Sequence, residues 1–365
     1  MILIPIGTKA QLVKMAPVIL AMKKQLVPFH FVLTGQHSET MNDLIIAFGL
    51  PQPDYTLVQV SEANTSLKLL KWLCIIVKRH LFINSEITKH HYQVCLVHGD
   101  TLSTLVCALI ARRYKIKVAH IEAGLRSFNY FHPFPEELVR VIVSKMSQIH
   151  FYAGAWAGNN LKKYKNKKTI DIKYNTLIDS VKFALSQKAK DFKFNIPNKF
   201  VIVSIHRFEN LSNPERLDFI IDQVLELQKK INVLFVLHPA TREKLNTLKK
   251  ASVLTDNGIS LIPRLDYIDF LALLNKSVFI ITDGGSNQEE CAYLKKPCLL
   301  MRKVTERVEG LDDTVVLAKY DSTIISEFIH KYISNEENKL MPNGILDVDS
   351  PSDIIASYVK GIISE

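Results

Sequence analysis

Carboxylates at three places in the sequence could move protons. Asp100 follows "QVCLV", Glu122 follows "KVAHI", and Glu136 and Glu137 lie in the proline-stiffened segment "HPFPEELVR" at a predicted helix start. A single carboxylate in such a place is usually a helix cap or a solvated group. Several that converge on one cleft can act as general acids and bases. We therefore predict a proton-transfer site, with capping as the alternative for each residue.

The segment "VFIITDGGSNQEECAY" (278–293) suggests phosphate binding. Gly284 and Gly285 open a predicted helix, where backbone N–H groups can approach a phosphate and the helix dipole favours anions. The alternative is a plain strand-to-helix turn whose acidic residues complement the dipole. His206 and Arg207 in "SIHRFEN" could neutralise phosphate oxygens, although a lone His more often satisfies a backbone group.

The elements that must position these residues alternate between two patterns. Long β-branched runs predict strands buried on both faces, as in parallel sheets, and segments such as "AQLVKMAPVILAMKKQL" have the apolar spacing of helices. Ligands of such sheets bind at the carboxyl ends of the strands, where the polar clusters fall. The predicted strands cover 1–6, 93–97, 117–121, 199–205, 232–237 and 278–282.

The lysine-rich stretch 161–175 interrupts this alternation and is the candidate for a linker. We therefore expect an α/β protein with two doubly wound, Rossmann-like domains, an N-terminal one over 1–168 and a C-terminal one over 169–350. The closing helix, 351–365, could pack on either domain, and we assign it to the first. The acid/base carboxylates then belong to the first domain and the glycine turn to the second.

Composition limits the class of protein. Of 365 residues, 47% are hydrophobic and 22% charged, so the chain can bury large cores. Lys+Arg 46 against Asp+Glu 36 gives a net charge of +10, which favours an acidic partner such as a nucleotide. The five cysteines lie mostly in apolar runs without C-x-x-C spacing. They predict reduced thiols and a cytoplasmic location.

Other classes lack their signatures in this sequence. No run approaches 18 apolar residues, and "MILIPIGTKAQ" is too short for a signal-peptide core, so we expect no membrane insertion. The histidines lack H-E-x-x-H spacing, which argues against a metal site, and Ser204 lacks the G-x-S-x-G elbow. No Walker loop, G-x-G-x-x-G or nucleic-acid-binding signature is found, so we expect no nucleic-acid partner.

Nine motifs resemble, in order, those of the UDP-N-acetylglucosamine 2-epimerase family, and the resemblance covers most of the chain. They are "GTKAQLVKMAPVI", "TGQHSETMNDLIIAFGL", "VHGDTLSTLVCALIARRYKIKVAHIEAGLRS", "PFPEELVR", "NTLID", "HRFEN", "TDGGSNQEE", "KKPCLLMR" and "TERVEG". The resemblance implies two Rossmann-like domains facing a cleft that holds the sugar nucleotide, the arrangement of glycosyltransferase-B enzymes. It also implies inversion at C2 by elimination and readdition of UDP through a 2-acetamidoglucal, without a cofactor.

The matching motifs imply roles for individual residues. Asp100, Glu122 and Glu136 would form the acid/base set, and His206 would lie near the diphosphate as a further catalytic residue. The implied substrate-binding residues are Lys9, Lys14, Arg264, Tyr267, Gly284, Gly285, Ser286, Glu290 and Arg307. Of these, the glycine turn and Ser286 would lie under the diphosphate, Glu290 would hold the ribose, and the backbone from Arg264 to Tyr267 would meet the uracil.

The sequence departs from the family pattern at three sites. One is the glycine turn, where Gly284-Gly285-Ser286 stands in place of the usual Ser-Gly-Gly and shifts the hydroxyl by two positions. Lys9 stands in "GTKAQ" where Gly-Thr-Arg-Pro-Glu is usual, so a point charge replaces a forked phosphate donor. Ser38 replaces the usual Arg of "TGQHSETMNDL", in a neighbourhood that relatives use to bind UDP-N-acetylglucosamine as an activator. We expect a regulatory site that does not fully match.

The predicted function is interconversion of UDP-N-acetylglucosamine and UDP-N-acetylmannosamine for a surface polysaccharide, and the resemblance implies a homodimer. Within the family, two alternatives stay open: a hydrolysing epimerase that releases N-acetylmannosamine and UDP, and an epimerase of a modified UDP-N-acetylhexosamine. From another class, the cleft could belong to a glycosyltransferase or a nucleotide-sugar sensor. A pure sensor would need the diphosphate contacts but not three acid/base carboxylates.

Overall fold

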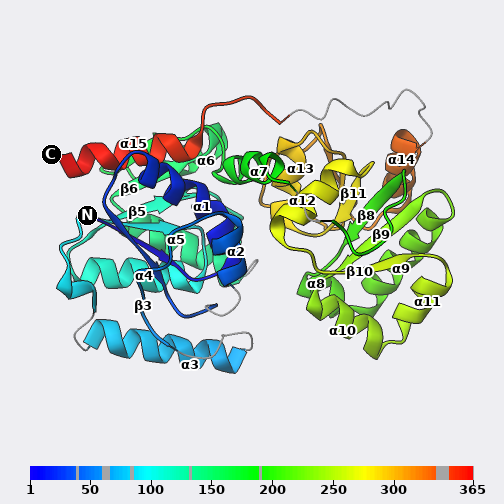
Figure 1. The fold of residues 1–365 in the computed structure, drawn as a ribbon, viewed down its shortest axis with the longest axis horizontal. Coiled ribbons are helices and arrows are strands. Elements are labelled where there is room, and N and C mark those ends of the chain that lie inside the picture. Colours follow the sequence, from blue (N-terminus) through cyan, green and yellow to red (C-terminus); the bar gives the residue numbers. More distant parts are fainter. Residues whose placement is uncertain are drawn as a thin grey trace. The chain divides into compact units, whose positions relative to one another are not determined.

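The computed structural model of the protein describes residues 1–37, 41–59, 66–82, 86–130, 134–188, 191–333 and 345–364. The chain divides into a first unit, residues 1–183 and 349–365, and a second unit, residues 184–348. Each unit contains one parallel sheet flanked by helices (Figure 1). The structure thus has the α/β class that the apolar runs predict.

The sheet of the first unit has the order β3-β2-β1-β4-β5-β6-β7, with every pair parallel. The residues of β4 are all buried, which is why the run is continuously apolar rather than alternating. The strands are β1 (Ile2–Ile6), β2 (Phe29–Leu33), β3 (Tyr55–Thr56), β4 (Val94–His98), β5 (Lys117–Ile121), β6 (Ile149–Tyr152) and β7 (Lys168–Asp171).

Two helices of this unit begin at residues whose side chains cap them. Thr8 caps α1 in a capping box with Gln11, and Thr101 caps α4. The α-helices are α1 (Lys9–Lys24), α2 (Asn42–Ala47), α3 (Ser66–Val77), α4 (Leu102–Arg113), α5 (Glu136–Met146), α6 (Gly154–Leu161), α7 (Leu177–Ser186) and α15 (Pro351–Ser364). A π-helical turn covers Lys78–Phe82 and a 3₁₀ turn covers Glu86–Lys89.

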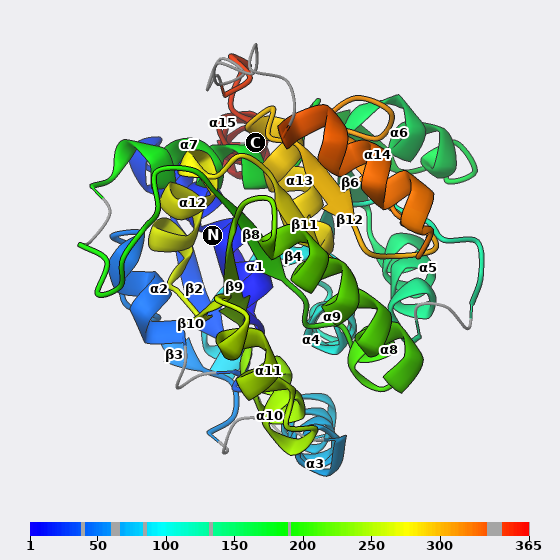
Figure 2. The same cartoon turned by 90° about the vertical axis from the view of Figure 1, so that its right-hand side faces the viewer.

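The second unit has a six-stranded parallel sheet of order β10-β9-β8-β11-β12-β13 (Figure 2). Residues of α9 and α14 share one buried apolar cluster with the central strands. The strands are β8 (Phe200–Ser204), β9 (Asn232–Leu237), β10 (Ser260–Pro263), β11 (Ile280–Thr282), β12 (Cys298–Leu300) and β13 (Val315–Leu317). The helices are α8 (Phe208–Leu211), α9 (Pro214–Gln228), α10 (Pro239–Thr247), α11 (Lys250–Asp256), α12 (Tyr267–Lys276), α13 (Gly285–Tyr293) and α14 (Ser322–Ile333).

The division between the units lies after Phe183, later than the 168/169 boundary placed from the sequence. The lysine-rich stretch 161–175 is not a linker, because it contains β7, which pairs with β6 at the edge of the first sheet. Its lysines suit an exposed edge strand, and this explains why the stretch appeared to interrupt the alternation. In α7, Ser180 Oγ donates to the carbonyl of Val13 at 2.6 Å, so this helix packs on the first unit.

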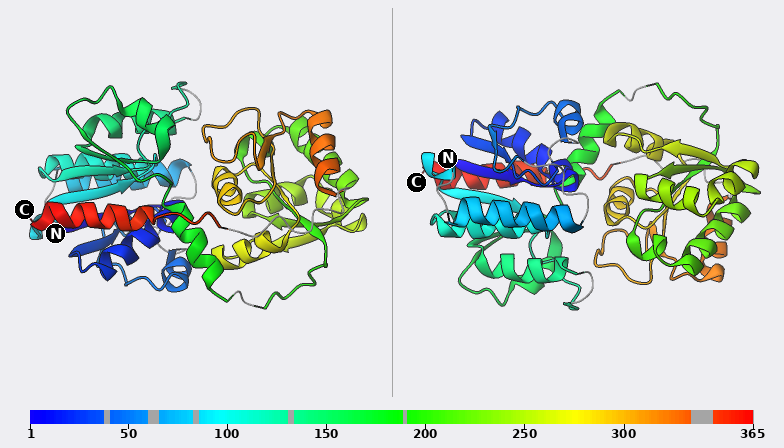
Figure 3. Two further views of the ribbon diagram at one scale, coloured as in Figure 1. Left: turned by 90° about the horizontal axis from the view of Figure 1, so that it is seen from above. Right: turned by 90° about the horizontal axis from the view of Figure 1, so that it is seen from below.

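The C-terminal helix α15 runs beside α1 in the first unit (Figure 3). Gln25, the C-cap of α1, donates to the carbonyl of Asp353 at 3.3 Å, and the backbone N–H of Ser352 donates to Asp179 of α7 at 2.9 Å. The chain therefore returns to its first unit at the end. Among the helices that the structure describes, none combines the length and the apolar character needed to span a bilayer.

Candidate active site

The turn after β4 presents Asp100 at the carboxyl end of the first sheet. Gly99 has a φ of 68°, in the left-handed region that favours glycine, and Thr101 then caps α4. The guanidinium of Arg140 contacts Asp100 Oδ2 through Nη2 at 2.6 Å and through Nε at 2.8 Å. Because the Asp100 side chain is 25% exposed, the arginine holds this carboxylate while leaving it accessible.

The same turn is fixed by buried His120 of β5, whose Nε2 donates to the carbonyl of Gly99 at 2.8 Å. Burial lowers the pKa of His120 to about 4, so the ring is neutral near pH 7. Sequence reasoning assigned His120 no role. The sequence shows only that His120 lies in a predicted strand. Its pairing with Val97 of β4, close to the Asp100 turn, becomes visible in the register of the sheet.

Gln11 ties the turn between β1 and α1 to the turn between β4 and α4. Its Oε1 accepts the backbone N–H of Gly7 at 2.9 Å, and its Nε2 donates to the carbonyl of His98 at 2.8 Å. It also contacts the hydroxyl of Thr104 at 2.8 Å. These contacts of Gln11 fix the start of α1 relative to the Asp100 turn. Lys9 is the first residue of α1 and is half-buried there.

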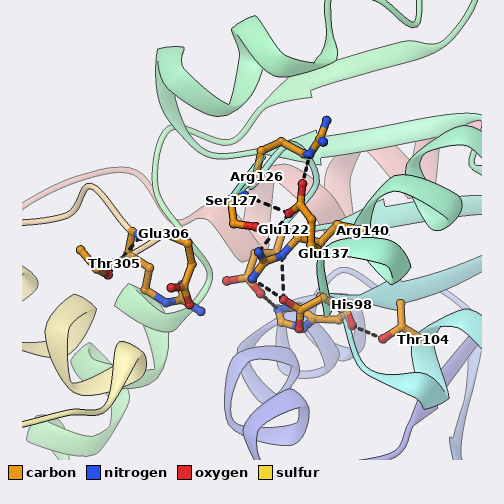
Figure 4. Close-up of polar contacts among 12 residues, drawn as sticks. His98, Thr104, Glu122, Arg126, Ser127, Glu137, Arg140, Thr305 and Glu306 are labelled. Carbon is orange, nitrogen blue, oxygen red and sulfur yellow. Dashed lines mark hydrogen bonds and ion pairs between the residues drawn. The ribbon is translucent and has the colours of Figure 1, made fainter. Parts of the chain in front are cut away.

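Glu122, directly after β5, is almost fully buried among polar partners. Its Oε1 contacts Lys14 Nζ at 2.6 Å and accepts Asn175 Nδ2 at 2.8 Å. Its Oε2 lies 3.6 Å from His98 Nε2 (Figure 4). The Glu122 backbone has a φ of 66°, a conformation that a non-glycine residue adopts rarely and at an energetic cost. The surrounding contacts therefore hold this carboxylate in one place. Sequence reasoning found Lys14 but missed Asn175.

The two glutamates that open α5 have different surroundings. Glu137 is wholly buried and pairs with Arg126 Nε, the backbone N–H of Ser127 at 2.9 Å and Arg140 Nη1 at 3.4 Å (Figure 4). Its neighbour Glu136 is half-buried, and its Oε2 has no hydrogen-bond partner among the residues that the structure describes. Glu137 is thus held by its neighbours in the fold, whereas one buried oxygen of Glu136 is left without a hydrogen-bond partner among the described residues.

In the second unit, Asp283 organises the loop after β8. This wholly buried carboxylate accepts the backbone N–H groups of His206 at 3.0 Å and Arg207 at 2.9 Å, and Asn210 Nδ2 at 2.9 Å. Burial is the main cause that lowers the pKa of His206; Asp283 opposes the shift, and Arg207 and Arg264 add to it. A neutral His206 beside two guanidinium groups can donate one hydrogen bond to an anion.

At the start of α13, neighbouring side chains approach the backbone closely. Gly284 is the N-cap and Gly285 the first helical residue. A Cβ at Gly284 would lie 2.6 Å from Asn287 Oδ1, and a Cβ at Gly285 would lie 2.9 Å from Arg307 Nε. The glycines thus keep the first amide groups of α13 beside a guanidinium, with half-buried Ser286 next to them. Helix N-termini of this kind bind phosphate groups.

Arg307 and Arg207 lie beside this helix start, and both belong to a cluster of three arginines with carboxylate partners. Arg307 Nη1 contacts Glu289 at 2.7 Å, while Glu306 lies 3.1 Å from Arg302 and 3.8 Å from Arg207. Burial would raise the pKa of Glu306, but the three guanidinium groups outweigh it and lower the pKa to about 2. Glu306 is therefore an anion held by arginines. Sequence reasoning described Arg302 and Glu306 only as part of a charge cluster.

Glu290, further along α13, is 3% exposed and accepts Asn287 Nδ2 at 2.8 Å. Burial, together with the carboxylates of Glu290 and Glu289, raises the pKa of Tyr267 well above its ordinary value, so its hydroxyl stays protonated. Arg264 is exposed at the end of β10, just before α12 begins at Tyr267. Tyr267 and Glu290 therefore lie close together.

Each unit gathers part of the predicted set. Lys9, Lys14, Asp100, Glu122 and Glu136 lie in the first unit, and His206, Arg264, Tyr267, Gly284, Gly285, Ser286, Glu290 and Arg307 lie in the second. Ser38, on which the regulatory-site prediction depends, is outside the described residues. Among the residues described, no three His, Cys, Asp or Glu side chains are grouped so that they could hold a metal ion.

Known proteins are similar to this one in both sequence and fold. The profile of the UDP-N-acetylglucosamine 2-epimerase family matches residues 21–350. The UDP-N-acetylglucosamine 2-epimerase of Campylobacter jejuni is 35% identical over 343 residues, covering 86% of this chain and 84% of its own. The crystal structure of the Neisseria meningitidis UDP-GlcNAc 2-epimerase bound to UDP-GlcNAc is 31% identical, with a TM-score of 0.79 and full coverage of both chains, 100% each.

A second solved structure agrees over the whole fold. The UDP-GlcNAc 2-epimerase of Methanocaldococcus jannaschii, in complex with UDP-GlcNAc and UDP, is 27% identical, with a TM-score of 0.81 and 99% coverage of each chain. These solved neighbours have the glycosyltransferase-B-like fold that the sequence predicts. The matched profile spans both units, from α1 of the first to the end of the second. This chain therefore belongs to the UDP-N-acetylglucosamine 2-epimerase family.

Proposed function

We propose that the protein interconverts UDP-N-acetylglucosamine and UDP-N-acetylmannosamine by elimination and readdition of UDP. A base removes the C2 proton, the C1–O bond breaks, and UDP leaves with the electron pair, which gives 2-acetamidoglucal with a C1–C2 double bond. A proton then returns to C2 on the opposite face as a UDP oxygen rebinds C1. Atoms and charge balance without a redox cofactor, and the step needs carboxylates that exchange protons.

The observation that carries this proposal is the set of three carboxylates held in different ways at one end of the first sheet. Glu122 is fixed between Lys14 and Asn175 in a costly backbone conformation. Asp100 is held by an arginine through one oxygen, and Glu136 has an oxygen without a partner among the described residues. Proton exchange at two faces of a sugar ring requires more than one such group. A pure nucleotide-sugar sensor has no use for them.

The second unit is proposed to bind the UDP group. The amide groups of Gly285 and Ser286 and the guanidinium of Arg307 would receive the diphosphate, where helix start and cation both favour an anion. Neutral His206 would donate a further hydrogen bond to it. Glu290 would accept the ribose hydroxyls, with the uracil near the backbone from Arg264 to Tyr267. In the first unit, Lys9 takes the place of the usual arginine as a single cation.

The wider setting of the reaction is also proposed. Buried, unpaired thiols at Cys95, Cys107, Cys291 and Cys298 suit the reducing cytoplasm, where a nucleotide sugar for surface polysaccharide would be made. A homodimer, implied by the family, could use the exposed leucines of α3, because Leu67 and Leu70 are 78% and 56% exposed at i, i+3 spacing. Light scattering of a Leu67→Ser/Leu70→Ser protein would then report a monomer.

Product analysis tests the proposal. Purified protein is incubated with UDP-N-acetylglucosamine, and the mixture is followed by NMR. We expect UDP-N-acetylmannosamine to appear until the two nucleotide sugars reach equilibrium, with UDP retained on the sugar. Accumulation of free N-acetylmannosamine with UDP would replace this proposal by the hydrolysing reaction. An unchanged substrate would favour a modified UDP-sugar or a sensor.

A further inference from the structure

Arg140 of α5 connects two of the carboxylates at the end of the first sheet. Its side chain is only 6% exposed. Nη2 and Nε both contact Asp100 Oδ2, and Nη1 lies 3.4 Å from Glu137 Oε2. Because both contacts to Asp100 go to Oδ2, they orient the carboxylate with Oδ1 as the oxygen left to meet a substrate proton. A lysine could not reproduce this, because it is a point charge without the planar fork.

Glu137 extends the connection to the loop that follows Glu122. Its Oε1 pairs with Arg126 Nε and also accepts the backbone N–H of Phe128 at 3.3 Å, while Oε2 accepts the N–H of Ser127 (Figure 4). Glu137 has no exposed surface, so these contacts are made in a water-poor setting where they are strong. The loop after β5 and the first turn of α5 are thereby fastened to each other.

The alternating charges therefore form one charge network, Asp100–Arg140–Glu137–Arg126, which includes one proposed acid/base residue and neighbours the other two in the sequence. Asp100 is a member of the charge network, and Glu136 precedes Glu137 in the same helical turn. Glu122 begins the loop that Arg126 anchors. We propose that Arg140 and Glu137 are positioning residues for the epimerase reaction, which set the orientation of Asp100 and the placement of Glu136 relative to the loop after β5. The inference rests on the proposed function of these carboxylates.

Because the charge network holds the carboxylates in place, we expect its loss to lower kcat. A carboxylate displaced by about 1 Å from its productive position can lose about 100-fold in rate. Neither Arg140 nor Glu137 is proposed to contact the UDP-sugar, so ground-state binding should be retained. Arg140→Met keeps most of the side-chain length but removes the charge and all donors. We expect it to lower kcat by about 10- to 100-fold, with KM and UDP affinity within about threefold of wild type.

Three further proteins make the test specific. Arg140→Lys should recover only part of the lost kcat, and added guanidinium ion should raise kcat of Arg140→Met but not that of wild type. Exposed Arg112 of α4 provides the matched control. Arg112→Met removes an equal charge from the same unit and leaves the charge network intact. If Arg140→Met does not fold, as judged by circular dichroism, Arg140→Lys and Glu137→Gln take its place with the same expectation of lower kcat at unchanged KM.

Asp100→Asn, measured in the same assay, separates this inference from the proposed function. An Asp100→Asn protein with wild-type kcat would remove Asp100 from the acid/base set. The charge network would then have no positioning role for Asp100 either. A severely slowed Asp100→Asn beside a fully active Arg140→Met would overturn the positioning role alone. A raised KM at normal kcat in Arg140→Met would also overturn it, because that pattern belongs to a substrate contact.

Discussion

Asp100 and Asp283 stand in comparable places, each shortly after a buried strand of a parallel sheet, but their surroundings differ. Asp283 has no exposed surface, and both of its oxygens accept N–H groups from the loop after β8. Asp100 is 25% exposed and is held through one oxygen by Arg140. The comparison shows that position at a strand end does not define a role. The number of donors directed at the carboxylate decides whether it builds a loop or faces a ligand.

The same contrast extends to the two units as wholes. At its strand ends the first unit presents carboxylates, such as Glu122, that are fixed by cations from neighbouring helices. The second unit presents glycines and guanidinium groups, and its strand-end carboxylate is turned inward. The first arrangement suits proton exchange and the second suits anion binding. Substitutions in each unit should therefore affect different observables.

The largest expected effect is that of Glu122→Gln. A glutamine keeps an oxygen for Lys14 and Asn175 but cannot exchange a proton at this position. Turnover should fall by about 100- to 10,000-fold, while calorimetric titration gives a UDP affinity close to wild type. Exposed Glu86→Gln is the control and should be fully active. Near-normal turnover of Glu122→Gln would remove this residue from the acid/base set.

Next in size is the stability difference between Asp283→Asn and Asp100→Asn. Both oxygens of Asp283 accept N–H groups, so either orientation of the new amide would place its NH₂ against a buried donor. We expect a loss of about 2 kcal/mol in the free energy of unfolding, measured with urea. Asp100→Asn can turn its NH₂ away from Arg140, because among the described residues the contacts to Asp100 go to Oδ2, and it should unfold within about 1 kcal/mol of wild type. Equal losses would break the comparison.

A smaller effect is expected for Glu290→Ala, which tests the second unit as the nucleotide site. Loss of a charge-assisted hydrogen bond to the ribose should weaken UDP binding about tenfold or more. Titration calorimetry measures it, with exposed Glu226→Ala as the matched control. If Glu290 only stabilises its helix, the melting temperature will drop slightly and UDP will bind as before.

The smallest effect concerns pH. Burial, with His120 next to it, lowers the pKa of His150 in β6 to about 4. Because this folded-state pKa is below the unfolded value, the neutral ring contributes stability that is present above about pH 6.5 and is lost as pH falls towards 4. From pH 7.5 to 5 we expect a loss on the order of 1 kcal/mol from this group. Urea unfolding of His150→Gln should show a smaller pH dependence than wild type, and an equal one would contradict the assignment.

The sequence could predict the fold class because strands buried on both faces are continuously apolar, and the carboxylates after β4 and β5 are visible as interruptions of that pattern. It missed β7, because an exposed edge strand with lysines resembles a linker. It could not separate Glu136 from Glu137, since adjacent residues differ in burial only once the helix is packed. Asn175, His120 and Arg140 were missed because their partners are distant in the chain. Their residue types alone carry no signal.

Solvent-deuterium incorporation at C2 reports directly on the proton exchange proposed for the first unit, which a protein that only binds the nucleotide would not catalyse. UDP-N-acetylglucosamine is incubated with the protein in deuterated water, and both nucleotide sugars are examined by NMR and mass spectrometry. We expect one deuterium at C2 of UDP-N-acetylmannosamine. In Glu122→Gln, incorporation of deuterium should be severely slowed although UDP still binds. Formation of the epimer with its original C2 proton retained, or unchanged exchange in Glu122→Gln, would contradict it.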